Sequence, residues 1–376
     1  EPAPVVPREA VLLPESSRCA PGRLRSFALP QFRMPVDGVR TAFCDAGTGP
    51  AVAFLQGPGA NLTHWAWVAQ RLVDGNRVIA LDLPGIGETA DDGAPPSVKR
   101  WAAHVGRLLD ARGVDRTAVV GHGLGAAVAV ELALRQPSRV TGLLLLDPAG
   151  LAPPPLWSRA AGHLLLRTGI FGAVLPRLWR HALDALFVEP NEYTSAFVHE
   201  LVDRCSDADV RSLAAGLTDA RADLLDRDAA RTFEYVAAPT MMAWGGADPL
   251  VDRSALRALA AARPGVEVRE IRGCGMLPMI ERPAEVVALL RDFVTVDDLP
   301  SDGSAQSART RPAAALRPAG RAADAEAVVT GLQEETDRSA PVMPEATASA
   351  PVAAPEIPAS RTSAPRRTSR LPRALL

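Results

Sequence analysis

An α/β fold with a mostly parallel central sheet, flanking helices and an inserted helical lid is predicted by this 376-residue sequence. Three observations predict it. Short apolar runs of strand length alternate with longer amphipathic stretches, which is the pattern of successive βαβ units. Several runs are apolar throughout, as is typical of parallel strands covered on both faces. In the middle of the chain this alternation stops, and apolar residues recur at helical spacing instead.

Seven segments are predicted to be strands, because each is a short run rich in aliphatic residues and bounded by turn residues. They are residues 39–44, 51–55, 77–81, 117–120, 143–146, 240–244 and 266–271. Parallel strands require crossover connections, and four amphipathic stretches are predicted to be the helices that provide them. They are residues 98–112, 124–135, 254–262 and 283–294.

Composition along the chain predicts four kinds of segment. Residues 1–36 are rich in Pro and Arg without a sustained period and are predicted to form an irregular arm. Residues 37–150 and 239–296 carry the strand and helix pattern of the core, and residues 151–238 carry the lid. Residues 297–376 are rich in Ala, Pro, Ser and Arg, so they bury too little apolar surface to offset the entropy of ordering. This tail is predicted to be disordered.

Global composition argues against several functional classes. A formal net charge of −2 gives no clear signal for nucleic acid. The four cysteines are far apart in the sequence, so neither a disulfide framework nor a metal site is predicted. No apolar run approaches the length of a membrane span and no signal peptide is visible, which favours a cytoplasmic location. We expect no cofactor.

Glycine-rich segments follow five of the predicted strands. They are Gln56-Gly57-Pro58-Gly59, the run from Asp82 to Gly87, Gly121-His122-Gly123-Leu124-Gly125, the run from Trp244 to Asp248, and the run from Gly273 to Pro278. The carboxyl ends of parallel strands meet at one edge of a sheet, where α/β proteins bind their ligands. The sequence therefore predicts a functional site at this edge.

The order of these motifs resembles the α/β-hydrolase superfamily, especially its lidded esterase-like and lyase-like members, over roughly residues 37–295. That superfamily places its nucleophilic serine in a G-x-S-x-G turn between a strand and a helix. The resemblance puts Gly123 at the nucleophile position, Asp248 at the acid position and Met276 at the histidine position. Asp147, at the end of an earlier strand, occupies the alternative acid position seen in some relatives. The resemblance thus implies a catalytic triad that has lost two of its three members.

The chemistry of the residues themselves also indicates that the catalytic triad is incomplete. Glycine tolerates strained backbone angles but has no side chain that can attack a carbonyl. All six histidines precede Asp248, whereas the triad order requires a histidine after the acid. Met276 exchanges no proton. The Leu124 backbone N–H can donate one bond to an oxyanion, but Pro58 has no N–H, and only a shift of one residue would give that role to Gly59.

The binding residues expected at the site are Gln56, Gly57, Pro58, Gly59, His64, His122 and Leu124. Several candidates have a structural alternative. The Asp248 side chain can cap the turn that follows it, and His122 and His64 can simply pack locally. Cys274 becomes a candidate nucleophile only if its surroundings lower the pKa of the thiol.

We therefore predict a non-hydrolytic pseudoenzyme that binds a small lipophilic ligand in an apolar pocket, or a protein partner, for which the tail is also a candidate. The alternative is an enzyme that uses the same pocket without a triad. In that case Asp248 or His122 activates water, or a proton is transferred without a covalent intermediate.

Overall fold

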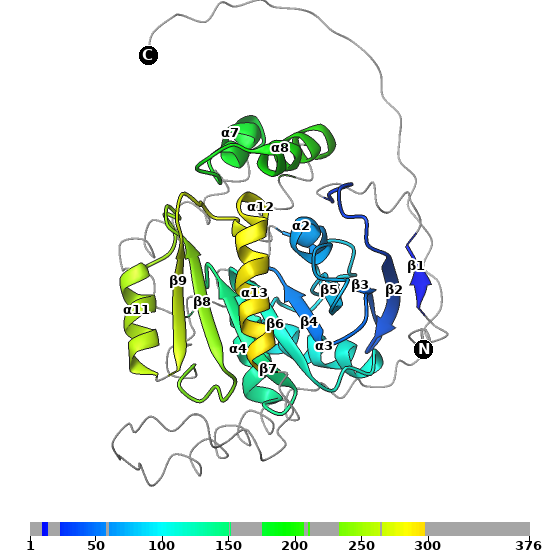
Figure 1. The fold of residues 1–376 in the computed structure, drawn as a ribbon. Helices are drawn as coiled ribbons and strands as arrows, with labels where there is room; N and C mark the ends of the chain where they lie inside the picture. The colour runs from blue at the N-terminus through cyan, green and yellow to red at the C-terminus, as the bar shows by residue number, and fades with distance from the viewer. Residues whose placement is uncertain are drawn as a thin grey trace, which may run out of the picture. The chain divides into compact units, whose positions relative to one another are not determined.

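A computed structural model describes residues 10–13, 23–57, 60–149, 151, 175–206, 210, 233–263 and 265–297. Their strands form one sheet of nine, in the order β1-β2-β3-β5-β4-β6-β7-β8-β9 (Figure 1). The strands are β1 (Val11–Leu12), β2 (Gln31–Val36), β3 (Val39–Ala46), β4 (Ala51–Leu55), β5 (Arg77–Leu81), β6 (Thr117–His122), β7 (Val140–Leu146), β8 (Thr240–Gly245) and β9 (Val266–Ile271). Pairing is antiparallel from β1 to β5 and parallel across the remaining strands. The predicted, mostly parallel sheet is confirmed.

Helices cover both faces of this sheet. They are η1 (Leu62–Trp65), α2 (Ala66–Ala69), α3 (Val98–Ala111), α4 (Leu124–Arg135), η2 (Leu175–Leu178), α7 (Trp179–Asp184), α8 (Glu192–Arg204), α11 (Arg253–Ala262), α12 (Pro278–Glu281) and α13 (Pro283–Asp297). The seven predicted strands and four predicted helices are all present, with ends that shift by up to three residues. The alternation of apolar runs and amphipathic stretches in the sequence therefore predicted the architecture correctly.

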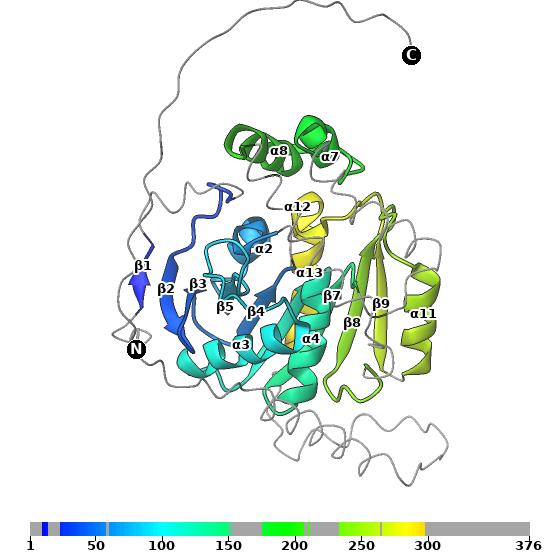
Figure 2. The ribbon, with the colours of Figure 1, turned by 180° about the vertical axis from the view of Figure 1, so that it is seen from behind.

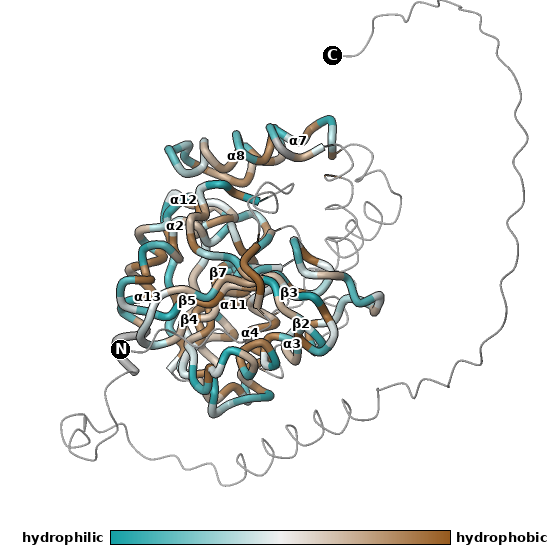
Figure 3. The backbone as a smooth tube through the Cα atoms, turned by 90° about the vertical axis from the view of Figure 1, so that its right-hand side faces the viewer, coloured by the Kyte–Doolittle hydropathy of each residue, from teal (hydrophilic) through white to brown (hydrophobic). Residues whose placement is uncertain are grey.

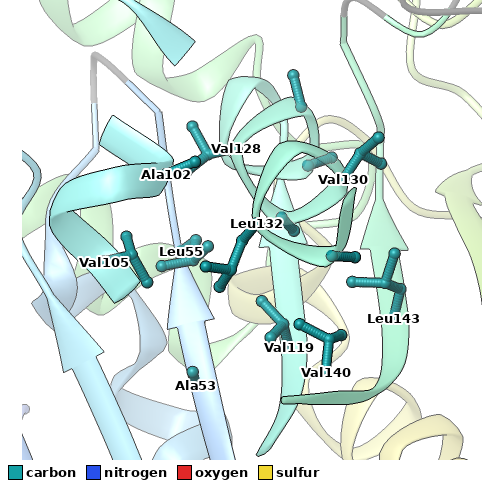
Figure 4. Close-up of a cluster of buried hydrophobic side chains, with 14 of the residues drawn as sticks. Ala53, Leu55, Ala102, Val105, Val119, Val128, Val130, Leu132, Val140 and Leu143 are labelled. Atoms are coloured by element: carbon teal, nitrogen blue, oxygen red, sulfur yellow. The ribbon is translucent and has the colours of Figure 1, made fainter. Parts of the chain in front are cut away.

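Two hydrophobic layers lie against the sheet, one on each face. Side chains alternate between the faces along a strand. Val119 and Leu143 accordingly pack with α3, α4 and α11, whereas Val120 and Leu144 pack with α2, α12 and α13. Figures 1 and 2 show α13 in front of one face and α3 with α4 in front of the other. Figure 4 shows part of the α3 and α4 layer, including Val119 and Leu143. Hydrophobic stretches follow the central strands in Figure 3.

The prediction that residues 1–36 form an irregular arm is wrong for the residues of β1 and β2. β2 pairs with β3 through Asp37 and Gly38, whose φ angles of 50° and 77° are those of a two-residue hairpin turn. Pro35 obscured the strand pattern because proline donates no ladder hydrogen bond. The β1 register covers only Phe32 and Arg33 of β2, so Pro35 lies beyond it. The missing N–H therefore costs no bond to β1.

The described part of the predicted insertion contains η2, α7 and α8 and no strand. Asn191 begins α8, and its side chain accepts hydrogen bonds from the first-turn backbone in a capping box completed by Thr194. Phe197 and Leu201 then bury one face of α8 in the layer that contains α2 and α12. The role of this insertion as a lid stays a prediction. Of the predicted disordered tail, only Asp297 is described, at the end of α13, and residues 298–376 lie outside the described residues.

Candidate active site

Gly123 stands at the turn between β6 and α4 with φ of 56° and ψ of −121°. The glycines around it are required by contact: a Cβ at Gly121 would lie 2.5 Å from the Gly125 carbonyl oxygen, and one at Gly125 would lie 2.3 Å from that of Leu55. Among the described residues, none has an atom within 4 Å of the position that a Cβ on Gly123 would take. The described part of the chain thus leaves space where a side chain of residue 123 would point.

Backbone hydrogen bonds fix this turn from two sides. The Gly123 N–H donates to the carbonyl of Leu146 at 3.0 Å. The Gly123 carbonyl accepts from the N–H groups of Ala126 and Ala149, each at 3.1 Å. The bond to Leu146 ties the turn to β7, and the bond to Ala126 belongs to the first turn of α4. The strained conformation is therefore held by the main chain and needs no side chain at residue 123.

Two carboxyl groups meet next to this turn. Asp248 follows β8, is buried, and accepts a hydrogen bond from the Leu250 N–H at 2.6 Å. Asp147 follows β7 with φ of 42°, and its Oδ1 accepts from the Gly245 N–H at 2.9 Å. Burial, and after it the neighbouring charge of Asp248, raises the pKa of the Asp147 carboxyl well above its usual range. The protonated form of the Asp147 carboxyl is therefore favoured relative to that of an exposed aspartate.

His122 precedes the turn and faces the same pair. Its Nε2 lies 2.9 Å from the Met276 carbonyl oxygen and 4.0 Å from Asp147 Oδ2. Burial lowers the pKa of His122, opposed by the bond to Met276 and by the charge of Asp248. The imidazole is thus neutral at pH 7. A carbonyl only accepts, so Nε2 carries the proton and Nδ1 is the acceptor nitrogen.

Met276 occupies the loop after β9 that was predicted to have lost its histidine. Its backbone N–H donates to the Leu186 carbonyl at 2.9 Å, and its own carbonyl contacts His122. The main chain of Met276 thus connects the insertion to the turn at Gly123. Burial raises the pKa of the neighbouring Cys274 thiol, so the geometry gives no support to a displaced thiolate nucleophile.

Glu281 fixes the position of this loop. Its Oε2 accepts from the Gly275 N–H at 2.7 Å, and its Oε1 accepts from the N–H groups of Val188 and Glu189 at 2.8 Å each. Glu281 is almost fully buried, so these three charge-assisted bonds compensate its loss of solvent. One carboxylate therefore holds the loop of Met276 against the described start of the insertion.

Gln56, expected to bind a ligand, is used by the protein itself. Its amide donates to the Leu81 carbonyl at 2.7 Å and accepts from Trp65 Nε1 at 3.0 Å, and the side chain is fully buried. This corrects the expectation for the Gln56 side chain. His64 is also buried, and its ring centre lies 5.1 Å from that of Phe197 with the two rings nearly perpendicular, an arrangement that favours packing.

Gly57 brings the preceding loop against the start of α4. A Cβ on Gly57 would lie 2.6 Å from the Leu124 Cβ and 3.2 Å from the Leu124 nitrogen, so only glycine permits this approach. Pro58 and Gly59 lie outside the described residues, and the second oxyanion donor stays a prediction. No group of three His, Cys, Asp or Glu side chains that could hold a metal is found in the described part of the chain. The helices of that part include none that is long and apolar enough to cross a membrane.

Comparison with known proteins gives the family. Residues 52–289, more than half of the chain, match the sequence profile of the alpha/beta hydrolase family. The chain belongs to this family. Within it, an uncharacterised protein of Mycobacterium tuberculosis is 30% identical over 326 residues, which cover 80% of this chain and 89% of that protein.

Other proteins resemble the chain in sequence or in fold. The dihydrolipoyllysine-residue acetyltransferase component of the acetoin cleaving system of Cupriavidus necator is 26% identical over 262 residues, 68% of this chain and 67% of that protein. Among solved structures, a membrane phospholipase A described as a bacterial virulence factor matches with a TM-score of 0.61. It is 26% identical, over 72% of this chain and 87% of that one.

One structural element of this alpha/beta hydrolase site was not predicted. Arg23, in the supposed arm, forms a fully buried ion pair with Asp82 at 2.7 Å. Asp82 also accepts hydrogen bonds from the Leu62 N–H at 2.7 Å and the Glu88 N–H at 2.9 Å. The pair thus fixes segments that follow β4 and β5. Asp82 was visible as a motif residue, but no pattern in the arm marked Arg23.

Proposed function

We propose that this chain is a non-hydrolytic alpha/beta hydrolase family member that binds a small apolar ligand above the turn at Gly123. The observation that carries the proposal is the open space beside Gly123, where a nucleophilic side chain would have to stand. Acyl transfer in this fold begins with attack by that side chain. A turn that keeps its strained backbone without the nucleophile supports binding without covalent chemistry.

The proton-transfer partner is also absent from its expected place. Met276 contributes only backbone groups, and its carbonyl engages the Nε2 proton of His122. That interaction uses the ring nitrogen of His122 nearest to the acid pair. The Asp248 side chain bonds to the Leu250 N–H in the turn that follows it, which favours the structural role for this carboxylate. These contacts support a site without an activated base for a serine.

An apolar ligand is supported by the elements around the site. The buried face of α8 and the segments on either side of Met276 belong to one hydrophobic layer. Pockets of this kind bind ligands mainly through apolar contact, with a few polar groups for orientation. The structural relative named a membrane phospholipase A favours an apolar ligand as well. A protein partner would be the other use of a site without chemistry.

The decisive experiment measures hydrolysis of p-nitrophenyl acetate, butyrate and octanoate by the full chain. We expect background rates for wild type, for Asp248→Ala and for the matched control Asp252→Ala. Asp252 is an exposed residue that caps α11. Turnover that is lost in Asp248→Ala and kept in Asp252→Ala would refute the binding proposal.

One observation favours a second candidate, an enzyme that works without a triad. Nε2 of the neutral His122 lies 4.0 Å from Oδ2 of Asp147, a carboxyl whose pKa burial raises, so an acid and a base are close together. In this case hydrolysis of the same esters should be measurable and should fall at least tenfold in His122→Gln. Rates equal to those of wild type in that variant would exclude His122 as the base.

A further inference from the structure

Strand β9 is the last strand at one end of the sheet, and its outer edge has no partner strand. Among the described strands it pairs with β8 alone (Figures 1 and 2). The Gly246 N–H donates to the Ile271 carbonyl at 2.8 Å, so the main chain of Ile271 faces β8. Main-chain groups of successive residues face opposite sides of a strand, so those of Val266, Val268 and Glu270 face the outer edge. Such a row of groups is a template for another strand.

These edge groups make few contacts within the chain. The Val266 N–H donates to the Arg263 carbonyl at 3.4 Å, in the turn before the strand. The Val268 carbonyl accepts from the Arg269 side chain at 3.1 Å. For the N–H groups of Val268 and Glu270, no hydrogen bond is found within the part of the chain that the structure describes. The edge therefore has donors and acceptors to offer.

Helix α11 covers a face of β9 and not its edge. Val266 and Val268 pack in the hydrophobic layer that contains Leu256 of α11. Glu270 lies on the same face, since side chains two positions apart point the same way along a strand. Its carboxylate accepts from Arg257 of α11 at 3.0 Å. The charge of Glu270 is thus compensated within the chain.

The opposite face of β9 carries two exposed charges of opposite sign. Glu267 and Arg269 are 55% and 52% exposed and pair with each other at 2.7 Å. Charged side chains normally protect an edge strand from pairing. Two opposite charges two positions apart allow one exception. A second copy of β9 that runs antiparallel can place its Arg269 opposite Glu267 and its Glu267 opposite Arg269.

We propose that β9 is the contact strand of a two-fold dimer of this chain, with Val268 opposite Val268 of the second copy. The two Val268 residues exchange main-chain hydrogen bonds, and the Glu270 N–H donates to the Val266 carbonyl of the second copy. Glu267 then faces Arg269 of the second copy on both sides of the axis. The two sheets become continuous.

Neighbouring registers are disfavoured by the same charges. A two-fold axis at Glu267 would set the two Glu267 carboxylates opposite each other, and an axis at Arg269 would do the same with two guanidinium groups. An axis at Glu270 would oppose two Glu270 side chains. Like charges directly opposite each other destabilise a strand pair, whereas opposite charges stabilise it. The register centred on Val268 is therefore the one that the charges select.

Sedimentation velocity of the full chain, up to about 100 µM, tests the proposal. Wild type should dimerise as its concentration rises. Glu267→Arg and Arg269→Glu each create like charges in both cross-strand pairs, so each should weaken the dimer at least about tenfold. The double variant restores both pairs with reversed polarity and should dimerise with an affinity within about threefold of wild type.

An equimolar mixture of the two single variants tests the register directly. Each pair between the two different chains again joins opposite charges, so a heterodimer should form although neither variant dimerises well alone. Arg180→Glu is the matched control, because it changes the net charge as Arg269→Glu does and lies on α7, where Arg180 is 65% exposed. Urea unfolding below the dimerisation range checks that the variants fold, as expected for exposed side chains.

Three results would overturn the proposal. A wild-type chain that stays monomeric at every concentration would exclude the dimer and leave the edge to a strand of another protein. A dimer that resists both single substitutions, or that neither the double variant nor the mixture restores, would exclude this register. A dimer weakened as much by Arg180→Glu would assign the effect to net charge. The ligand site proposed at Gly123 would be unaffected by any of these results.

Discussion

Alanine substitutions in the turn around Gly123 separate steric contact from backbone strain. A Cβ at Gly121 would lie 2.5 Å from the Gly125 carbonyl oxygen and 2.6 Å from the Ala126 Cα, and one at Gly125 would lie 2.3 Å from the Leu55 carbonyl oxygen. Cβ atoms do not approach backbone atoms this closely, so β4, β6 or α4 must shift. We expect Gly121→Ala and Gly125→Ala each to lower the free energy of unfolding by about 3 kcal/mol, the upper end of the overpacking range.

Gly123→Ala should behave differently, because its new methyl group would enter open space. The remaining cost is the φ of 56°, a region that disfavours residues with a side chain. That strain lowers the free energy of unfolding by about 1 to 2 kcal/mol. The matched control is Gly113→Ala, since Gly113 has φ of 63° and no atom within 4 Å of its Cβ position. The two should be similar.

Urea unfolding followed by circular dichroism measures these costs, provided that the slope with denaturant stays constant across the variants. The expected ranking puts Gly121→Ala and Gly125→Ala well below Gly123→Ala and Gly113→Ala in stability. A cost for Gly123→Ala as large as that for Gly121→Ala would refute the open space beside Gly123. With it, the proposed ligand site above the turn would also be lost.

The double variant Gly123→Ser with Met276→His restores both missing side chains and should raise p-nitrophenyl acetate hydrolysis above background, whereas either single change should not. Background hydrolysis by the double variant would argue against a usable acid or oxyanion loop. Arg23→Met leaves the fully buried carboxylate of Asp82 without its ion-pair partner and should lower the free energy of unfolding in urea by about 3 to 5 kcal/mol. Arg269→Met removes only an exposed ion pair and should lower it by less than about 1 kcal/mol. Equal losses would contradict this account. Because the folded-state pKa of Asp147 is raised, its stabilising contribution is complete below the unfolded pKa of about 3.9 and is lost as pH rises through the folded value. Wild type should therefore lose stability relative to Asp147→Asn as pH rises above about 4, and parallel pH profiles would refute the shift.

The parallel part of the sheet was predictable because most of its strands are buried apolar runs, whereas β9, an edge strand whose sequence alternates apolar and charged residues, was recognised as a short strand bounded by turn residues. Strands β4, β5 and β9 have the predicted ends. β2 was not predicted, since Pro35 and the polar Gln31 and Arg33 hide its alternation. The adjacent Asp37-Gly38 pair is a strong hairpin signal and was the information that could have located β2.

The site was predictable in its order along the chain but not in its contacts. The strand-to-helix turn at Gly123 could be located because glycine spacing is a local property. The bond from His122 to the Met276 carbonyl joins residues 154 positions apart, and nothing in either local segment encodes it. The same reason explains Gln56, which looked available in sequence and is occupied by Leu81 and Trp65 in the fold.

The clamp formed by Glu281 restricts how the site can open. Its carboxylate holds the N–H groups of Val188 and Glu189 together with that of Gly275, and its backbone carbonyl accepts from the Asn191 side chain. Moving the segment before α8 away from α12 would remove hydrogen-bond donors from the buried Glu281 carboxylate, at a cost of about 1 to 3 kcal/mol for each lost bond. Ligand entry that displaced this segment would therefore carry the Met276 loop along as one rigid unit. Access to Gly123 is accordingly expected from a direction that leaves this pair of segments together.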